Sequence, residues 1–478
     1  MKRFGIGLLS LGLVAAFSMS AFAANMDFGG HLRIRGWYND NQALLEDTAA
    51  NAGHSSFFEQ RLRLSGRIRL ADGVLITTRF DALENFWGFN RTPLVGGVPT
   101  STTDSQNLQW EIANMSFKTK FGSFLVGSTN APLAYGTKYW ESGEGVRYII
   151  RYTVPVGPLE VRATWEKKAE SQVWGSAVRD DQDGDNDIYA IAAKYKGKAF
   201  ETGVQLQHMI DNSARAGAAS ATTGFSKRLS AFQPYLISKF GNLDLQLEGL
   251  YVFGDAKKYD APAGANIDVD ASGYGAFFNA KYTMGPAYLA FMASYTTGDD
   301  PATADEQEGS FAANFDGASS QGGSSSPRPL LILQNTTFNS FFGNQVGNLR
   351  TGAGSYVGRQ NIGPMAANND NCMQFNIYGD YAFTPKWDLF FTVTYTKADE
   401  KPQVAAAGGN QAAGVFIDDE IGTEVDVVLN YKITGQLTYS VQAAYFKVGD
   451  YFKGNPAVGA NVTVDDNYVL MHALLLEF

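Results

Sequence analysis

Arginines recur at every second position in two segments near the start of the chain. Arg33 and Arg35 alternate with apolar residues, and the segment from residue 58 to residue 70 repeats the pattern. Alternate side chains of a β-strand point to opposite faces, so these guanidinium groups share one face. Guanidinium groups bind anions, and they cost about 2–4 kcal/mol at a bilayer midplane. We therefore expect a polar interior lined by Arg33, Arg35, Arg61, Arg63, Arg67, Arg69, Arg79, Arg147, Arg151 and Arg162.

Carboxylates occupy equivalent positions, most of them in the second half of the chain. The expected inward-facing acidic residues are Glu59, Asp244, Glu248, Asp380, Asp388, Glu424 and Asp426. If strand order follows sequence order, a basic wall should face an acidic wall across the interior, with groups such as Glu424 and Asp426 opposite the arginines. Such walls create a transverse field that acts on polar and charged solutes. The alternative is that the charges only pair with their neighbours and fill the interior.

The segments that carry these residues follow a regular rhythm. Strand-like stretches of about ten alternating residues are joined by eight tight turns rich in Gly or Pro and by nine long polar loops. Aromatic residues gather at both ends of the apolar rows, as in interfacial belts. This pattern predicts an all-β fold, a transmembrane antiparallel up-and-down β-barrel of about eighteen strands over residues 24–478. Both termini are expected on the side of the short turns.

The two ends of the chain carry signals of export and assembly. Lys2 and Arg3 precede a short apolar stretch and Ala21-Phe22-Ala23, which predicts a signal peptide over residues 1–23. The alternating run from Tyr468 to Phe478 resembles the C-terminal strand of bacterial outer-membrane barrels, whose terminal aromatic residue is read by the barrel assembly machinery. That resemblance makes Phe478 the expected assembly signal, with no part in lining the pore.

The whole mature chain resembles a Gram-negative outer-membrane porin. The eighteen-strand count and the motifs Leu32-Arg33-Ile34-Arg35 and Phe58-Glu59-Gln60-Arg61-Leu62-Arg63 are similar to the alginate-export and related porin-like families. The resemblance implies a multi-pass barrel in the outer membrane, surrounded by lipid and lipopolysaccharide. It also implies a water-filled channel for small hydrophilic or charged solutes, either passive or substrate-preferring. A homotrimer is one assembly consistent with it.

One predicted loop, residues 298–371, is too long for a simple connection. It begins acidic, becomes rich in Gly and Ser, and then turns apolar at Leu330–Leu333 and Phe338–Phe342. An irregular backbone cannot bury those apolar residues in lipid, because its amides would stay unsatisfied. We expect this extracellular loop to fold inward and narrow the pore, or else to form a subunit interface.

Other functions have weaker support in the sequence. The net charge of −10 argues against nucleic acid, and neither the four His residues nor Cys372 form a catalytic pattern, so no enzyme is expected. The only candidate for a metal site or a cofactor is a possible Ca²⁺ loop at Asp181, Asp183, Asp185 and Asp187. This loop lacks the Glu that occupies the twelfth position of an EF-hand. Three alternatives stay open: an adhesin, a sheath for a partner such as an electron-transfer cytochrome, and a polysaccharide exporter.

Overall fold

The computed structural model describes most of the chain after residue 24. The described residues are 25–41, 44, 54–70, 73–87, 108–133, 135–137, 139–140, 146–170, 184–215, 224–261, 266–300, 302–309, 332, 371–401, 404–405, 411–412, 418–455, 460–461 and 463–478. The predicted signal peptide lies outside these residues.

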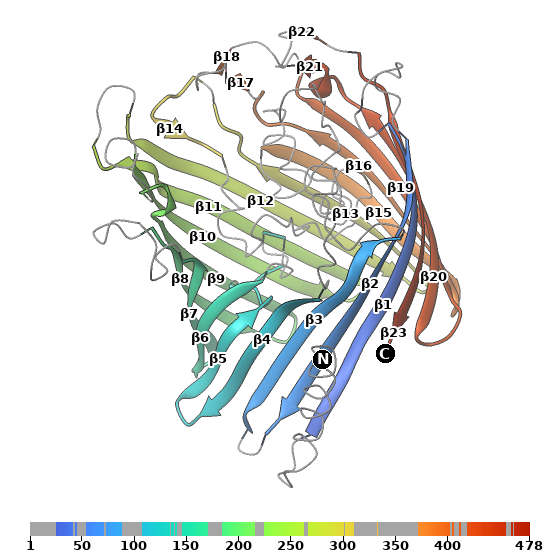
Figure 1. The fold of residues 1–478 in the computed structure, drawn as a ribbon, viewed down its shortest axis with the longest axis horizontal. Helices are drawn as coiled ribbons and strands as arrows, with labels where there is room; N and C mark the ends of the chain where they lie inside the picture. The colour runs from blue at the N-terminus through green and yellow to red at the C-terminus, as the bar shows by residue number, and fades with distance from the viewer. Residues whose placement is uncertain are drawn as a thin grey trace, which may run out of the picture.

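Eighteen antiparallel strands of the described residues form one closed barrel, which confirms the predicted fold class (Figure 1). In chain order they are β1 (Asn25–Asp40), β2 (Ser55–Arg69), β3 (Leu75–Phe86), β4 (Leu108–Thr119), β5 (Gly122–Thr129), β6 (Arg147–Val156), β7 (Leu159–Ala169), β8 (Asn186–Lys196), β9 (Phe200–Asp211), β10 (Phe225–Phe240), β11 (Leu243–Tyr259), β12 (Val269–Met284), β13 (Ala287–Thr296), β15 (Cys372–Thr384), β16 (Trp387–Lys397), β19 (Glu420–Lys432), β20 (Leu437–Val448) and β23 (Asn467–Glu477).

Shorter elements lie in the connections between these strands. The two-residue strand β14 (Glu306–Gln307) pairs in parallel with β12. Two further pairs of two-residue strands stand apart from the barrel sheet, and two 3₁₀ turns complete the described elements: β17 (Val404–Ala405), β18 (Gln411–Ala412), β21 (Gly454–Asn455), β22 (Ala460–Asn461), η2 (Ser213–Arg215) and η4 (Asp450–Lys453). In the described part of the chain, no helix is long and apolar enough to cross a membrane.

Each long strand pairs with its neighbours in the sequence, and β23 closes the ring by pairing with β1. The closing register runs from His31 opposite Glu477 to Asp40 opposite Tyr468. Figure 1 shows the consequence, since the blue first strand and the red last strand lie side by side. Residues from the two ends of the chain are therefore neighbours in the barrel.

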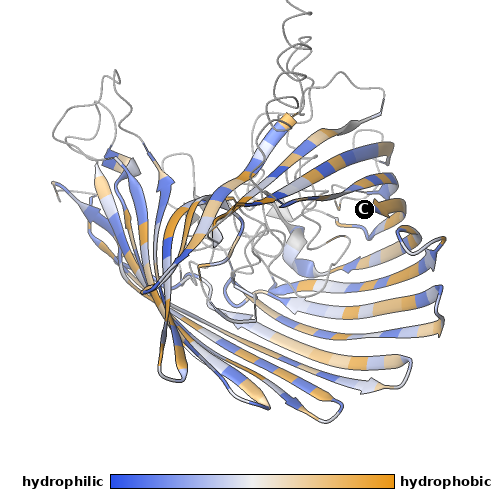
Figure 2. Ribbon diagram, turned by 90° about the horizontal axis from the view of Figure 1, so that it is seen from below, coloured by the Kyte–Doolittle hydropathy of each residue, from blue (hydrophilic) through white to orange (hydrophobic). Residues whose placement is uncertain are grey.

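The alternation of side chains separates an apolar outer surface from a polar inner one. Along the strands of Figure 2, hydrophilic and hydrophobic residues alternate. Large apolar side chains on the outer row are strongly exposed, among them Trp110 at 59%, Ile191 at 55% and Ile377 at 51%. A continuous apolar outer surface of this kind is stable only against another apolar medium, so it forms the lipid-facing band of a transmembrane barrel.

The connections differ between the two ends of the barrel. At one end the strands are joined by the tight turns predicted from the sequence, such as those at Gly241 and Gly285, whose φ angles of +59° and +56° suit glycine. At the other end lie the described parts of the long connections. Strand length also varies around the barrel, from 8 residues in β5 to 17 in β11.

Candidate functional site

The inner face of β1 and β2 carries a dense row of charged side chains. The strand register sets Arg33 opposite Arg61 and Arg35 opposite Glu59, with all four residues on the inward face. The alternation of the sequence alone predicted that these side chains point inward. The register then adds what alternation cannot, which is the identity of each cross-strand neighbour.

Two carboxylates each contact two of these arginines. Glu59 accepts a hydrogen bond from Arg35 Nε, and its Oε1 lies 3.8 Å from Arg33 Nη2. Asp81 on β3 accepts two hydrogen bonds of 2.6 Å from Arg63, which is the bidentate geometry of a strong pair. The same carboxylate lies 3.8 Å from Arg61.

A third carboxylate, Glu111 on β4, continues the series. Its Oε2 lies 3.0 Å from Arg63 Nη2 and 2.7 Å from Arg79 Nε. These ion pairs form two clusters that adjoin where Arg33 stands opposite Arg61 in the register. We call the two clusters together the arginine ladder, and its members are Arg33, Arg35, Arg61, Arg63, Arg79, Glu59, Asp81 and Glu111. Five arginines share three carboxylates within it, so the ladder keeps an excess of positive charge towards the lumen.

Asp81 and Glu111 are absent from the site residues predicted from the sequence. Asp81 could have been found, because it shares the alternation of Arg79 on the same strand. Glu111 could not, because the register of β3 and β4 shifts between Arg79 and Phe80, and Glu111 lies at that irregularity. A bulge changes the face to which a side chain points.

The other predicted arginines fall into two groups. Arg67 and Arg69 are exposed near the turn end, where Arg69 pairs with Asp27. Arg147, Arg151 and Arg162 lie on β6 and β7, and Arg147 forms a buried 3.1 Å ion pair with Glu166. Arg151 and Arg162 instead donate to backbone carbonyls of the connection between β5 and β6.

That connection folds into the barrel. We call its residues 130–133, 135–137 and 139–140 the inner loop. Arg151 Nη2 donates to the carbonyl of Pro132 at 2.6 Å, and the side chain of Leu133 is fully buried. Tyr139 stacks on Phe277 of β12 with ring centroids 4.2 Å apart. The inner loop therefore reaches from β5 and β6 to a wall six or seven strands further round.

An acidic residue of that far wall holds the inner loop in place. The amide of Thr137 donates to Glu248 Oε2 at 2.9 Å, and the Thr137 hydroxyl donates to the same oxygen. Nearby, the Tyr135 hydroxyl donates to Glu160 at 2.6 Å. The Arg162 guanidinium carbon lies 3.9 Å above the centroid of the Tyr135 ring. Burial raises the pKa of Tyr135, which stays a neutral hydrogen-bond donor. The sequence pattern indicated only a polar connection here.

The predicted acidic residues are distributed around the barrel. Asp244 and Glu248 on β11 lie halfway round from β2. The expectation that Glu424 and Asp426 face the arginines across the interior is wrong. Both lie on β19, which is only three strands from β1 because β20 and β23 complete the closure, so they lie on the same side as the arginine ladder. Asp388 accepts a 2.7 Å hydrogen bond from Asn430, and Asp380 is partly exposed on the inward row of β15.

The long loop over residues 298–371 touches the interior at one described position. The amide of Ile332 donates to Glu424 Oε1 at 2.8 Å. The Ile332 side chain is 1% exposed and packs in a cluster with Trp37, Cys372 and Phe446. Of the apolar stretch Leu330–Leu333, only Ile332 is among the described residues, and it packs on the inner wall. The stretch Phe338–Phe342 lies outside the described residues, so the inward course of the whole loop stays a prediction.

The candidate calcium loop is only partly described. Asp181 and Asp183 lie outside the described residues, whereas Asp185 and Asp187 both pair with Lys167. Among the described residues, no group of His, Cys, Asp and Glu side chains has an arrangement that could hold a metal ion. Ca²⁺ at this loop stays an untested prediction.

At the C-terminus, Phe478 bonds to the first strand. Its amide donates to the carbonyl of Gly30 at 3.0 Å, and its carbonyl accepts from the amide of Gly30 at 2.8 Å. The Phe478 side chain is 51% exposed on the outer row. The last residue thus completes the closing ladder and points its ring away from the lumen.

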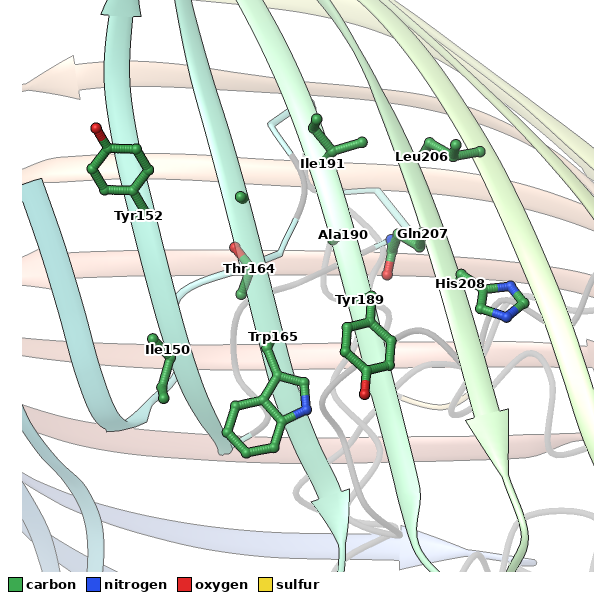
Figure 3. Close-up of a pocket in the computed structure, with 11 residues that line it drawn as sticks. Ile150, Tyr152, Thr164, Trp165, Tyr189, Ala190, Ile191, Leu206, Gln207 and His208 are labelled. Atoms are coloured by element: carbon green, nitrogen blue, oxygen red, sulfur yellow. The ribbon is translucent and has the colours of Figure 1, made fainter. Parts of the chain in front are cut away.

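The outer face has a groove of its own, shown in Figure 3. It has a volume of about 530 Å³ and is lined by side chains of β6–β9, including Ile150, Trp165, Tyr189, Leu206 and His208. These residues belong to the outer row, and Trp165 Nε1 donates to Asp187 at 3.0 Å near the loop end. The groove faces the lipid side and is separate from the lumen.

Comparisons with known proteins agree with this architecture. No protein-family model and no curated protein matches the sequence. Among solved structures, Acinetobacter baumannii OccAB1 is 12% identical with a TM-score of 0.50, covering 95% of this chain and 97% of that one. The chain therefore shares the closed antiparallel β-barrel fold of OccAB1.

Two further solved structures are similar over nearly their whole length. Pseudomonas aeruginosa OccK2 (OpdF) is 12% identical with a TM-score of 0.48, covering 95% of this chain and 98% of that one. OmpT, an outer membrane protein of Vibrio cholerae, is 12% identical with a TM-score of 0.39, covering 96% of this chain and 99% of that one.

Proposed function

We propose that this protein is an outer-membrane channel for the diffusion of small hydrophilic or charged solutes. The observation that carries the proposal is the inner wall. A barrel of eighteen strands is wider than its own side chains can fill. Its lining includes an arginine ladder with more positive than negative charge and an inner loop that enters the lumen from the wall.

The arginine ladder gives the channel a preference for anions. Guanidinium groups held in fixed positions by Glu59, Asp81 and Glu111 present donors to a passing anion without having to reorganise. Conduction requires binding that is favourable enough for entry and weak enough for release. Glu59, Asp81 and Glu111 reduce the positive potential of the ladder, so an anion is attracted but can still be released.

Assembly in the outer membrane is part of the proposal. The exposed apolar outer row suits lipid, and Phe478 offers its ring on the outer surface where assembly machinery can read it. Lipopolysaccharide is the expected neighbour at the loop end, where Trp165 lines the outer groove and Lys167 follows two residues later on β7.

Planar-bilayer recording of the purified full-length protein tests the function. We expect stable single-channel steps in KCl and a reversal potential in a salt gradient that reports anion preference at low salt. A protein that inserts as a folded barrel but conducts no ions would contradict the channel and favour an interaction barrel.

A further inference from the structure

The turn end of the inner wall holds a second charged site, distinct from the arginine ladder. A pocket of about 470 Å³ lies between the turn-side ends of β8–β12. Four lysines and two carboxylates line it: Lys196, Lys198, Lys239, Lys281, Glu201 and Asp244. None of the four lysines is among the ten arginines expected to line the pore, and the site lies halfway round the barrel from the ladder.

The four lysines of the pocket outnumber its two carboxylates, which leaves the pocket basic. Asp244 lies 3.3 Å from Lys239 and 3.6 Å from Lys281, so one carboxylate serves two ammonium groups. Glu201 lies 4.0 Å from Lys196 and accepts a 3.0 Å hydrogen bond from Tyr235. Within the described residues, Lys198 has no ion pair. The pocket therefore carries two more positive than negative charges.

The position of the pocket relates it to the path through the barrel. Thr137 of the inner loop lines it, and the amide of Thr137 is held by Glu248. The pocket thus extends from Thr137 of the inner loop to the turn between β8 and β9. Gln246 and Asn279 add neutral hydrogen-bonding groups to its wall. A solute that passes the inner loop towards the turn end enters this space.

We propose that this pocket is an exit subsite for small organic or inorganic anions that carry a carboxylate or phosphate group. The inference rests on the proposed channel function and deepens it by naming the solute class. Its volume falls in the range of about 300–1,000 Å³ that is typical of small-ligand sites. Lysine ammonium groups are flexible point charges, so they attract many anions and release them readily. The site raises the local anion concentration on the turn side of the inner loop.

The experiment is single-channel recording of the full-length protein, with succinate or inorganic phosphate added to one side at a time. We expect a concentration-dependent reduction of current with a lower half-blocking concentration from the turn side. Block by succinate alone identifies a carboxylate site, and block by phosphate alone a phosphate site. Glycerol, which is neutral, should cause no such asymmetry.

Two variants with opposite expected effects on the half-blocking concentration make the test specific. The double variant Lys196→Gln, Lys198→Gln should raise the turn-side half-blocking concentration about three- to tenfold, as expected for two exposed charges. Asp244→Asn should lower it, because it removes a negative charge from the same pocket. The matched control is Lys386→Gln, Lys432→Gln, which neutralises two exposed lysines at other turns and should leave it unchanged.

The outcomes separate this inference from the proposed function. If the barrel folds but no variant conducts, the channel function fails. If the channel conducts and the block is equal from both sides, or the control changes it as much as the pocket variants do, the subsite is overturned while the channel stands.

Discussion

His472 covers Gly36 across the seam where β23 closes onto β1. A Cβ atom at position 36 would stand 2.9 Å from His472 Cδ2 and 2.8 Å from Phe58 Cε1, closer than real Cβ contacts. The His472 ring also packs edge-on to Phe58, with centroids 5.5 Å apart. The polar His472 ring on the lipid-facing row is therefore explained by packing, because it fills the space beside Gly36, which has no side chain, where the two end strands meet.

Gly36→Ala should impair barrel closure, since the added methyl group forces these rings apart at a cost of about 1–3 kcal/mol. Heat-modifiability gels and the urea concentration at which the barrel unfolds measure the effect. The double variant Gly36→Ala, His472→Ala should recover most of the loss. Gly249→Ala is the matched control, because its new Cβ would meet only Pro234, at 3.4 Å. If Gly36→Ala and Gly249→Ala reduced the stability of the barrel equally, the contact between Gly36 and His472 would have no special role in closure.

Deleting Phe478 should reduce surface assembly while leaving the conductance of the assembled fraction unchanged. The deletion removes both the aromatic ring and the two backbone hydrogen bonds to Gly30. Phe478→Ala removes only the ring, so comparing the two variants separates signal recognition from closure. Surface levels in heat-modifiability gels are the measurement, and wild-type levels of both variants would refute the assembly role.

Glu248→Ala should release the inner loop and raise single-channel conductance and its noise. The loss of charge-assisted hydrogen bonds to Thr137, worth about 1.5–3 kcal/mol, increases the open population of the loop about ten- to a hundredfold. Asp388→Ala is the control, since this inward carboxylate binds Asn430 and makes no described contact with the inner loop. Unchanged conductance in Glu248→Ala would place the constriction elsewhere.

Neutralising Arg61, Arg63 and Arg67 together with Gln should shift the reversal potential towards cations. The opposite variant, Asp81→Asn with Glu111→Gln, should shift it towards anions, because those carboxylates temper the arginine ladder. Both shifts should shrink with salt, as the Debye length falls from about 10 Å at 0.1 M to about 3 Å at 1 M. Selectivity that stays the same at low salt would show that these arginines are only structural partners of the carboxylates.

Replacing the loop over residues 310–370 by a short turn should raise conductance and leave the barrel folded. Ile332 buries its side chain against the inner wall and donates its amide to Glu424, so removal of the loop opens that part of the lumen. Ile332→Asp tests the same contact with one substitution, because it places a second carboxylate beside Glu424. If conductance is unchanged and an oligomer dissociates instead, the loop forms a subunit interface.

The sequence by itself determined the barrel. Alternation with a period of two decides which face each side chain occupies, and this is a local property that needs no knowledge of distant contacts. For that reason Arg33, Arg61 and Glu248 could be placed on the inner face from the sequence, and the turns and loops could be counted to eighteen strands.

Only the tertiary structure decided which inner residues meet. The bidentate contact of Arg63 with Asp81 depends on strand register, and the place of Glu111 depends on a register shift. Closure brought Glu424 to the side of the arginine ladder, and the docking of Thr137 on Glu248 joins residues 111 positions apart. Such contacts arise from the packing of distant segments, which a local period of two does not encode.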